Sequence, residues 1–225
     1  MKETYTAIIP VRAGSQRLKN KNILPFGESN LLIHKIRQLK KVSLIDKIVV
    51  SSDCDIMLDM AKSEGVKIHR RGLPFADDQI KTINEVVAHI VSEIKGDHIL
   101  WLQCTSPLLD VEHYVDAIKQ YHSHVVKGSY DSLLSVSSAK YFFWDETKPL
   151  NFSIEYQVRS QALPNWYVMT CGIWMASQKI MLERKGYIGI KPYLFEVDKI
   201  AAIDIDDEYD MEMARALYEY THKKF

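Results

Sequence analysis

Four cationic side chains follow the first apolar run of the chain within ten residues, and no acidic side chain lies among them. The segment reads RAGSQRLKNK over residues 12–21, and its cations are Arg12, Arg17, Lys19 and Lys21. Gly14 lets backbone N–H groups approach an anion, Ser15 adds a hydroxyl donor, and the cations neutralise charge on phosphoryl oxygens. The spacing therefore predicts a phosphate-binding loop, with a solvated basic loop as the alternative. Because neither GxGxxG nor GxxxxGK[ST] occurs in it, a dinucleotide fingerprint and a P-loop are poorly supported.

Paired carboxylates stand near the other end of the chain, in the sequence IDIDDEYD over residues 203–210. If this segment forms a strand, alternation places Asp204 and Asp206 on one side, about 7 Å apart. Two carboxylates so placed suit Mg²⁺, which favours one or two carboxylates together with substrate phosphate oxygens. The alternative is that Asp206, Asp207 and Glu208 cap the last helix, which accounts for Asp207 and Glu208 but not for Asp204. The residues alone leave both interpretations open.

Gln103 is a neutral hydrogen-bonding side chain that directly follows an apolar run, in the sequence WLQCTSPLL over residues 101–109. Such a side chain can contact a ligand. A turn in which Thr105 and Ser106 satisfy the local backbone is an equally ordinary interpretation.

Another charged segment, RRGLPFADDQIKT, spans residues 70–82. Its chemistry-bearing side chains are Arg70, Arg71, Asp77, Asp78 and Thr82. Without further context, a surface loop that ends in a helix cap at Thr82 is the simpler interpretation, because Thr82 and Glu85 have the spacing of a capping box.

His122, His124 and the three cysteines are not expected to bind a metal ion. His122 and His124 fall at a predicted helix end, where imidazoles are favourable near exposed carbonyl groups. Cys54, Cys104 and Cys171 are odd in number and share no CxxC or Cys/His spacing, so we expect reduced thiols.

Alternating strands and helices must position these side chains. The expected strands are 5–11, 47–52, 66–69, 98–103, 132–137 and 168–177, and the expected helices are 31–42, 56–64, 82–94, 111–121, 180–183 and 207–220. Continuous apolar strands joined by helices indicate a Rossmann-like α/β fold with a mostly parallel sheet covered on both faces. Ligands of such a sheet bind outside the carboxyl ends of its strands.

Residues 138–165 interrupt this rhythm with a polar, aromatic segment that has no helical period. Its aromatic cluster comprises Tyr141, Phe142, Phe143, Trp144 and Phe152. We expect one domain over residues 1–225, with 138–165 as an excursion that packs against a partner subunit.

Composition excludes several classes of protein. The 225 residues carry 29 Lys+Arg and 29 Asp+Glu, so the formal net charge is 29 − 29 = 0. A dedicated nucleic-acid binder usually has a clear cationic excess. No stretch reaches the roughly 18 apolar residues of a membrane span, and the first residues do not form a signal peptide. We therefore expect a cytoplasmic protein that binds neither nucleic acid nor membrane.

Four motifs occur in the order that is typical of one enzyme family. They are IIPVRAGSQRLKNKN (8–22), RRGLPFADD (70–78) with Thr82 after it, LQCTSPL (102–108) and IDIDDEYD (203–210). In this combination the chain resembles the acylneuraminate cytidylyltransferases, also called CMP-sialic acid synthetases, over nearly its full length. A sister family that activates 3-deoxy-manno-octulosonate shares the opening motif.

The resemblance implies a reaction and a fold. A hydroxyl of an acidic sugar, sialic acid or a related nonulosonate, would attack the α-phosphorus of CTP, and pyrophosphate would leave. The implied fold is of the nucleotide-diphospho-sugar transferase type, and the excursion would form a homodimer contact.

The resemblance also implies site residues. Those that match nucleotide-binding positions are Arg12, Gly14, Ser15, Lys21, Asn22, Arg71 and Thr82. Gln103 matches a glutamine that faces the sugar, and Asp204 and Asp206 match the paired ligands of Mg²⁺, for which Mn²⁺ can substitute. Arg12 and Lys21 would stabilise the transition state, and Asp206 could orient or deprotonate the nucleophile.

Departures from the family pattern concern the sugar. They are Cys104 after the glutamine, Leu109 after SPL, and Val168, Thr170 and Cys171 around Gly172. A cation for the sugar carboxylate is missing from its usual place, and Arg159 is a candidate replacement from the excursion or from a second subunit. The acceptor is therefore a modified nonulosonate or another compound.

Two other functions compete with this one. A nucleotide-sugar glycosyltransferase would use Asp204-Ile205-Asp206 as its DxD motif, although that motif normally lies near mid-chain. A nucleotide-binding regulator without catalysis is the other, and the intact Arg12, Lys21 and paired aspartates count against it.

Overall fold

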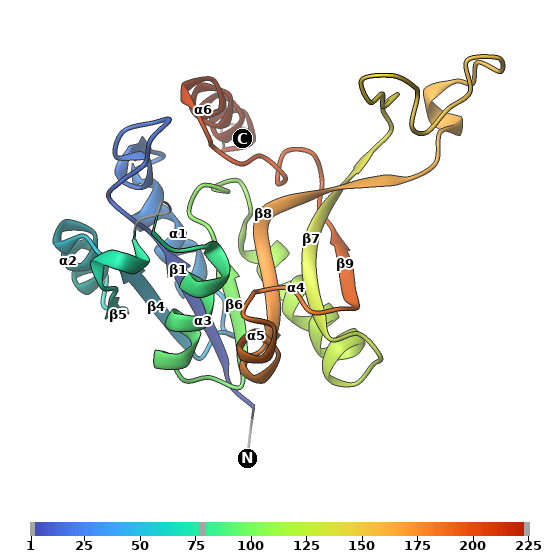
Figure 1. Ribbon diagram of the computed structural model, residues 1–225. Coiled ribbons are helices and arrows are strands. Elements are labelled where there is room, and N and C mark those ends of the chain that lie inside the picture. Colours follow the sequence, from blue (N-terminus) through green and yellow to red (C-terminus); the bar gives the residue numbers. More distant parts are fainter. Residues whose placement is uncertain (1–2, 77–79, 223–225) are drawn as a thin grey trace.

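A twisted sheet runs through the molecule and carries helices on both faces (Figure 1). The computed structural model describes residues 3–76 and 80–222, and within them seven strands form this sheet in the order β5-β4-β1-β6-β8-β7-β9. The strands are β1 (Tyr5–Pro10), β4 (Lys47–Ser52), β5 (Lys67–Arg70), β6 (His98–Leu102), β7 (Ser132–Ala139), β8 (Trp166–Ser177) and β9 (Pro192–Glu196). A small antiparallel hairpin pairs β2 (Pro25–Phe26) with β3 (Ser29–Asn30).

Six α-helices accompany the strands in the described residues. They are α1 (Leu31–Lys40), α2 (Asp55–Ser63), α3 (Ile83–Glu93), α4 (Val111–Tyr121), α5 (Gln178–Arg184) and α6 (Glu208–His222). Short helical turns are Lys21–Ile23, Leu73–Phe75, His122–Val126 and Ser160–Ala162. No helix among the described residues is both long and apolar enough to cross a membrane.

The pairing confirms the expected mostly parallel sheet. β5, β4, β1 and β6 are parallel to one another, and β7 is parallel to β9. β8 is antiparallel to both of its neighbours, β6 and β7. β9 was not predicted from the sequence. The suggested strand at Asp204 and Asp206 was wrong, because this segment forms no strand.

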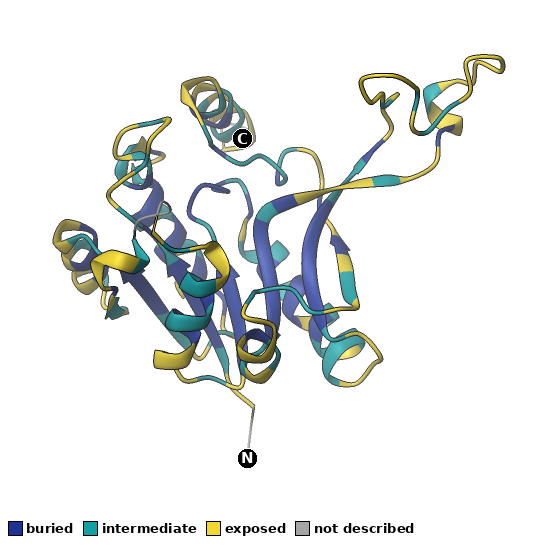
Figure 2. Ribbon diagram, viewed as in Figure 1, coloured by how far each residue is buried: buried dark blue, intermediate teal, exposed yellow. Residues whose placement is uncertain are grey.

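The strands are continuous in apolar residues because both faces of the sheet are buried. In β1, Ala7 and Ile9 pack into the core beneath α1, α2, α4 and α6, whereas Ile8 packs into the core beneath α3 and α5. β6 divides in the same way, with Leu100 on the first face and Trp101 on the second. Figure 2 shows this buried centre, with helices of mixed exposed and less exposed residues around it.

Helix starts follow the sequence signals. The capping box is present in full at α3, where Thr82 accepts from the Glu85 backbone and Glu85 accepts from the Thr82 backbone. Asp110 caps α4 in the same manner. Ile56 and Ile83 are exposed at the first turns of α2 and α3.

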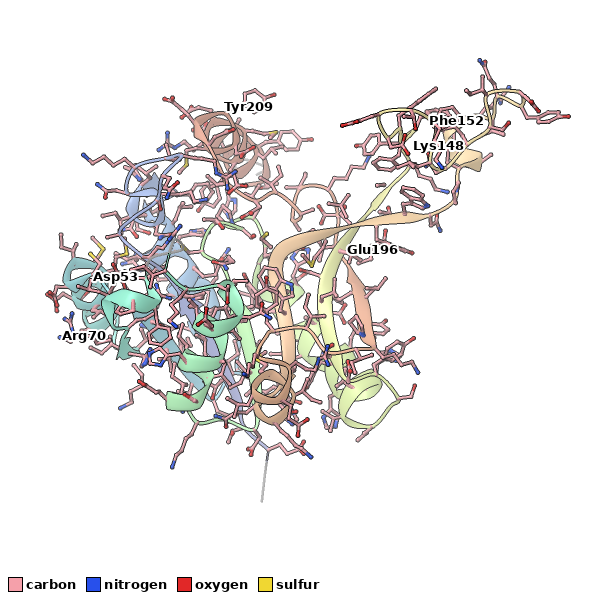
Figure 3. All side chains as sticks on the ribbon, in the orientation of Figure 1. Asp53, Arg70, Lys148, Phe152, Glu196 and Tyr209 are labelled. Carbon is pink, nitrogen blue, oxygen red and sulfur yellow. The ribbon has the colours of Figure 1, made fainter. Side chains whose placement is uncertain are left out.

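Beyond the sheet, β7 and β8 continue as a two-stranded arm that carries residues 140–165 away from the body (Figure 1). The labelled Lys148 and Phe152 lie at its far end (Figure 3). Rings of the predicted aromatic cluster contact one another there: Phe142 and Trp144 each pack edge-on against Phe152. The excursion therefore begins two residues later than predicted, since residues 138–139 still belong to β7.

Candidate active site

A cavity of about 580 Å³ opens at the carboxyl-end edge of the sheet. The predicted site residues that line it are Arg12, Ser15, Lys21, Asn22, Arg71, Gln103, Asp204 and Asp206. Arg17, Phe75, Lys81, Trp101 and Cys171 also contribute to its wall. The cavity thus lies where ligands of a parallel sheet are expected.

The topology explains why residues distant in sequence meet here. Arg12 follows β1, Arg71 follows β5 and Gln103 follows β6, and these parallel strands end at the same edge. Asp53, which follows β4, accepts a hydrogen bond from Ala13 N at 3.3 Å at this edge (Figure 3). Loops after adjacent parallel strands therefore form one continuous rim.

The acidic segment reaches the rim without being a strand. Ile205 N donates to the carbonyl of Thr105 at 2.8 Å, and the Ile205 side chain is fully buried. Asp204 and Asp206, on either side of this anchor, are only partly buried and both line the cavity. Asp204 and Asp206 are thus placed by the backbone hydrogen bond and the buried side chain of Ile205, and not by the alternation of side chains along a strand.

Lys21 and Arg17 hold Asp206 from the basic loop. Lys21 Nζ lies 3.1 Å from Asp206 Oδ1 and donates to the carbonyl of Ile205 at 2.7 Å. Arg17 donates to the same carboxylate oxygen at 2.7 Å. Although partial burial opposes it, the hydrogen bonds and charges of Lys21 and Arg17 lower the pKa of Asp206. Its carboxylate is therefore ionised at neutral pH.

Asp204 lies on the inner side of the cavity. Ser106 Oγ donates to Asp204 Oδ1 at 3.5 Å. The neighbouring Cys171 thiol has a pKa raised to about 12, first by burial and then by the charge of Asp204. A thiol held in its protonated form is a poor nucleophile. The carboxylates of Asp204 and Asp206, not this thiol, are thus the groups with the chemistry to hold a hard divalent cation.

Asn22 and Arg71 brace the loop after β1. The Asn22 amide donates to the carbonyl of Arg12 at 3.0 Å and accepts from Cys104 Sγ at 3.2 Å. Arg71, which is almost fully buried, donates to the carbonyl of Val11 at 2.7 Å. The backbone where the basic loop leaves β1 is therefore held from two sides.

Gly14 and Thr82 are not among the lining residues, although both were predicted to contact a nucleotide. A Cβ atom added at Gly14 would meet nothing within 4 Å. The Thr82 hydroxyl is engaged with Glu85 in the capping box, while its neighbours Lys81 and Ile83 line the cavity. The nucleotide contacts of Gly14 and Thr82 stay predictions. Asp77 and Asp78 lie outside the described residues.

Lys35 was missed by the sequence reasoning. It is fully buried on α1 beneath the site, where its ammonium donates to the carbonyl of Ser106 at 2.8 Å and to the hydroxyl of Tyr114. Burial lowers the pKa of Lys35 to about 7, against the opposing attraction of Cys104 and Asp204. The helical spacing carried a signal of this burial, because Lys35 lies four residues from both Leu31 and Leu39, which are buried on the same face of α1.

Two departures from the family pattern turn out to be core residues. Cys104 and Leu109 are fully buried, and neither lines the cavity. Leu109 packs so closely on Gly172 that a Cβ atom there would lie 2.5 Å from Leu109 Cδ1. Thr170 is also buried and shares a 2.6 Å hydrogen bond with Ser135. Among Val168, Thr170 and Cys171, Cys171 is the one that reaches the cavity.

Comparisons with known proteins agree on a family. A family model described as Cytidylyltransferase matches residues 6–219. The N-acylneuraminate cytidylyltransferase of Escherichia coli O18:K1:H7 is 28% identical over 222 residues, which cover 95% of this chain and 52% of the relative. The pseudaminic acid cytidylyltransferase of Campylobacter jejuni serotype O:2 is 26% identical over 229 residues, which cover 96% of this chain and 97% of the relative. The chain thus spans about half of the first relative.

Solved structures confirm the fold. CMP:2-keto-3-deoxy-manno-octonic acid synthetase complexed with CTP superposes with a TM-score of 0.71 at 15% identity, covering 97% of this chain and 99% of the other. The 4-diphosphocytidyl-2C-methyl-D-erythritol synthase of Anaerococcus prevotii gives 0.68 at 14% identity, covering 96% and 99%. The predicted α/β architecture is therefore that of known nucleotidyltransferases.

Proposed function

The chain belongs to the cytidylyltransferase family, and on that premise we propose that it transfers CMP from CTP to a hydroxyl of an acidic sugar and releases pyrophosphate. The relatives named above act, by their names, on N-acylneuraminate and on pseudaminic acid. We propose an acceptor of the same chemical class, a sialic acid or related nonulosonate.

One observation carries this proposal: the basic loop and the paired carboxylates line a single cavity, in which Lys21 and Arg17 contact Asp206. A nucleoside triphosphate needs cations along its phosphates and a divalent ion between them. Lys21, Arg17 and Arg12 supply fixed positive charge in this cavity, and Asp204 and Asp206 supply oxygen ligands beside it. Few other ligands would need both fixed cations and carboxylate ligands for a divalent ion.

In the proposed reaction, the acceptor oxygen forms a bond to the α-phosphorus of CTP. The bond from that phosphorus to the bridging oxygen breaks, pyrophosphate leaves, and the acceptor hydroxyl loses its proton. Lys21 and Arg12 would offset the charge that develops on the phosphoryl oxygens, and the braced loop would fix the triphosphate in line with the acceptor. Asp206, ionised at neutral pH, could accept or direct the proton.

Asp204 and Asp206 are the residues that would hold Mg²⁺, or Mn²⁺ in its place. Their oxygen donors fit the preference of these ions for carboxylates combined with phosphate oxygens. When bound, the ion would supply positive charge to the triphosphate. Within this site, Lys21 and Arg17 keep the Asp206 carboxylate oriented toward the cavity.

Gln103 is proposed to contact the acceptor, because it lines the cavity at the end of β6 beside Trp101 and Cys171. The arginines that line the cavity among the described residues are Arg12, Arg17 and Arg71, and none of them lies on β8, the strand of Cys171. Arg159 lies exposed in the arm. We propose that it meets the sugar carboxylate from a partner subunit.

A homodimer built through the arm would provide that partner. Residues 140–165 present Tyr141, Trp144, Ile154 and Tyr156 as exposed apolar side chains. Large apolar groups gathered on one projecting segment are typical of protein interfaces. The cytoplasm is the proposed location, since all three cysteines are free thiols, as expected of a reducing compartment.

The test is an assay of pyrophosphate release with CTP, Mg²⁺ and a panel of 2-keto-3-deoxy sugar acids. Release that requires both CTP and an acceptor would support the proposal, and ATP, GTP and UTP serve as matched controls. Sugar transfer from a preformed nucleotide sugar would replace it with glycosyl transfer by a DxD motif. Binding of CTP without turnover on any acceptor would indicate a regulator.

A further inference from the structure

His69, His89 and Glu93 converge beside the nucleotide cavity without lining it. His69 lies on β5, while His89 and Glu93 lie four residues apart on α3 and so share one face of that helix. Within residues 3–76 and 80–222, these are the only three His, Cys, Asp or Glu side chains whose ligand atoms gather so closely. The cluster joins an edge strand of the sheet to the helix that covers it.

The spacing of the ligand atoms suits a metal ion. His69 Nε2 lies 2.8 Å from Glu93 Oε2, and His89 Nδ1 lies 3.4 Å from Glu93 Oε1. When one ligand atom is taken from each residue, the three atoms lie within 4.8 Å of one another. Zinc bonds of about 2.0–2.1 Å in tetrahedral geometry place neighbouring ligand atoms about 3.3 Å apart. Small side-chain shifts would bring the three atoms to that separation.

Ser51 orients the first histidine. The fully buried Ser51 hydroxyl lies 2.9 Å from His69 Nδ1, so that nitrogen is occupied and Nε2 faces Glu93. Metal-binding histidines usually have a hydrogen-bonding partner on the nitrogen that does not bind the ion, because this sets the tautomer and the ring orientation. One of the three candidate ligands, His69, therefore has a buried hydrogen-bond partner that fixes its ring.

Burial of His89 disfavours its charged form, and a metal requires the neutral imidazole. Two imidazoles and one carboxylate are ligands that zinc accepts readily and that magnesium does not prefer.

The cluster has one contact with the cavity wall. The His89 ring stacks on Phe75 with centroids 3.8 Å apart and an interplanar angle of 13°, and Phe75 lines the cavity. An ion held by His89 would therefore fix the His89 ring, against which Phe75 of the cavity wall packs.

We propose that His69, His89 and Glu93 form a zinc-binding site that fastens β5 to α3 behind Phe75. The fourth position of the ion is open to water, because Glu93 is half exposed. The inference does not depend on the proposed function, since none of the three residues is assigned to CTP, the acceptor or Mg²⁺.

The test is titration of the metal-free full chain with Zn²⁺ against a chromophoric chelator, in excess Mg²⁺ so that the carboxylate pair is occupied. One equivalent of zinc should bind and raise the melting temperature. Co²⁺ should give the visible absorption of a low-coordinate site with nitrogen and oxygen ligands. Glu93→Gln and His69→Ala should remove this binding, and Ser51→Ala should weaken it about 10- to 100-fold.

Glu93→Gln changes an exposed side chain and should keep its fold, which the melting temperature without zinc will show. The matched control is His113→Gln, since His113 lies near the carboxylates of Asp110 and Asp198 but has no second imidazole. Its zinc binding should equal that of the unsubstituted chain. Failure of the unsubstituted chain to bind zinc, or unchanged binding in both Glu93→Gln and His69→Ala, would overturn the proposal. Binding that is lost in Asp206→Asn but kept in Glu93→Gln would also overturn it.

Discussion

Lys21 and Asp206 form an ion pair across 185 positions of the sequence, with Lys21 Nζ 3.1 Å from Asp206 Oδ1. The pair joins the basic segment at residues 12–21 to the acidic segment at residues 203–210. A formal net charge of zero therefore conceals two opposed local concentrations of charge that meet in one cavity. A triphosphate that enters would attract Lys21 and Arg17, and so free the carboxylate of Asp206 for a divalent ion.

Asp206→Asn should reduce CTP-dependent turnover by about 100-fold or more, because the amide retains the shape but loses the charge that holds the ion. Pyrophosphate release at saturating CTP measures this. The matched control is Glu208→Gln, an exposed carboxylate in the first turn of α6, and its rate should stay normal. Near-normal turnover in Asp206→Asn would remove Asp206 from the metal site.

Lys21→Met should reduce turnover by roughly 100- to 1000-fold, the cost of removing one preorganised group that stabilises developing charge. The methionine keeps most of the apolar stem, so packing changes little. Lys19→Met is the comparison, since Lys19 stands in the same loop but is exposed and does not line the cavity. Equal rates in the two variants would show that only the total charge of the loop matters.

The fold could be predicted because its signals are local. Strands buried on both faces are continuously apolar, as in β1 and β6, and helix starts have caps such as Thr82 with Glu85. β9 was missed because it is an edge strand in which only Phe195 is buried. The antiparallel direction of β8 depends on how the chain returns from the arm, which no local pattern specifies.

The site could be predicted where residue type alone indicates chemistry. The loop from Arg12 to Asn22 and the paired aspartates were found in this way, and the structure places them on one cavity. The geometry of Asp204 and Asp206 could not be foreseen, because the hydrogen bond from Ile205 to Thr105 holds them. Lys35 was missed although it lies on the apolar face of α1 with Leu31 and Leu39, because the residue type alone suggested a solvated lysine.

Ile154→Glu should convert a dimer into a monomer, because a carboxylate would have to be buried where the arm presents an apolar side chain. Ile154 is 62% exposed in the single chain, so the substitution leaves the core intact. Light scattering after size-exclusion chromatography gives the mass of each form. Ile190→Glu is the control, since Ile190 is 76% exposed in the loop before β9, and its mass should match that of the unsubstituted protein. Dimers in both variants, or monomers in the unsubstituted protein, would contradict an interface through the arm.

Lys35 gives the stability of the protein a predictable pH dependence. Its folded pKa is about 7 because of burial, whereas the unfolded value is 10.5. Below about pH 7 Lys35 is protonated in both the folded and the unfolded state, so it does not make the free energy of unfolding depend on pH. Above pH 7 the unfolded state binds one proton more, so the free energy of unfolding rises with pH by about 1.4 kcal/mol per unit.

The difference in free energy of unfolding between Lys35→Met and the unsubstituted protein should therefore favour the variant most near pH 6. This difference should shrink as the pH rises. Urea unfolding between about pH 6 and pH 9 measures it. The thiols of Cys104 and Cys171, whose pKa values are raised to about 12, act in the opposite direction only above pH 9, at the end of this range. Lys40→Met, on the exposed face of the same helix, is the matched control for the loss of a lysine from α1. Parallel stability curves for Lys35→Met and the unsubstituted protein would mean that Lys35 keeps an ordinary pKa beneath the site.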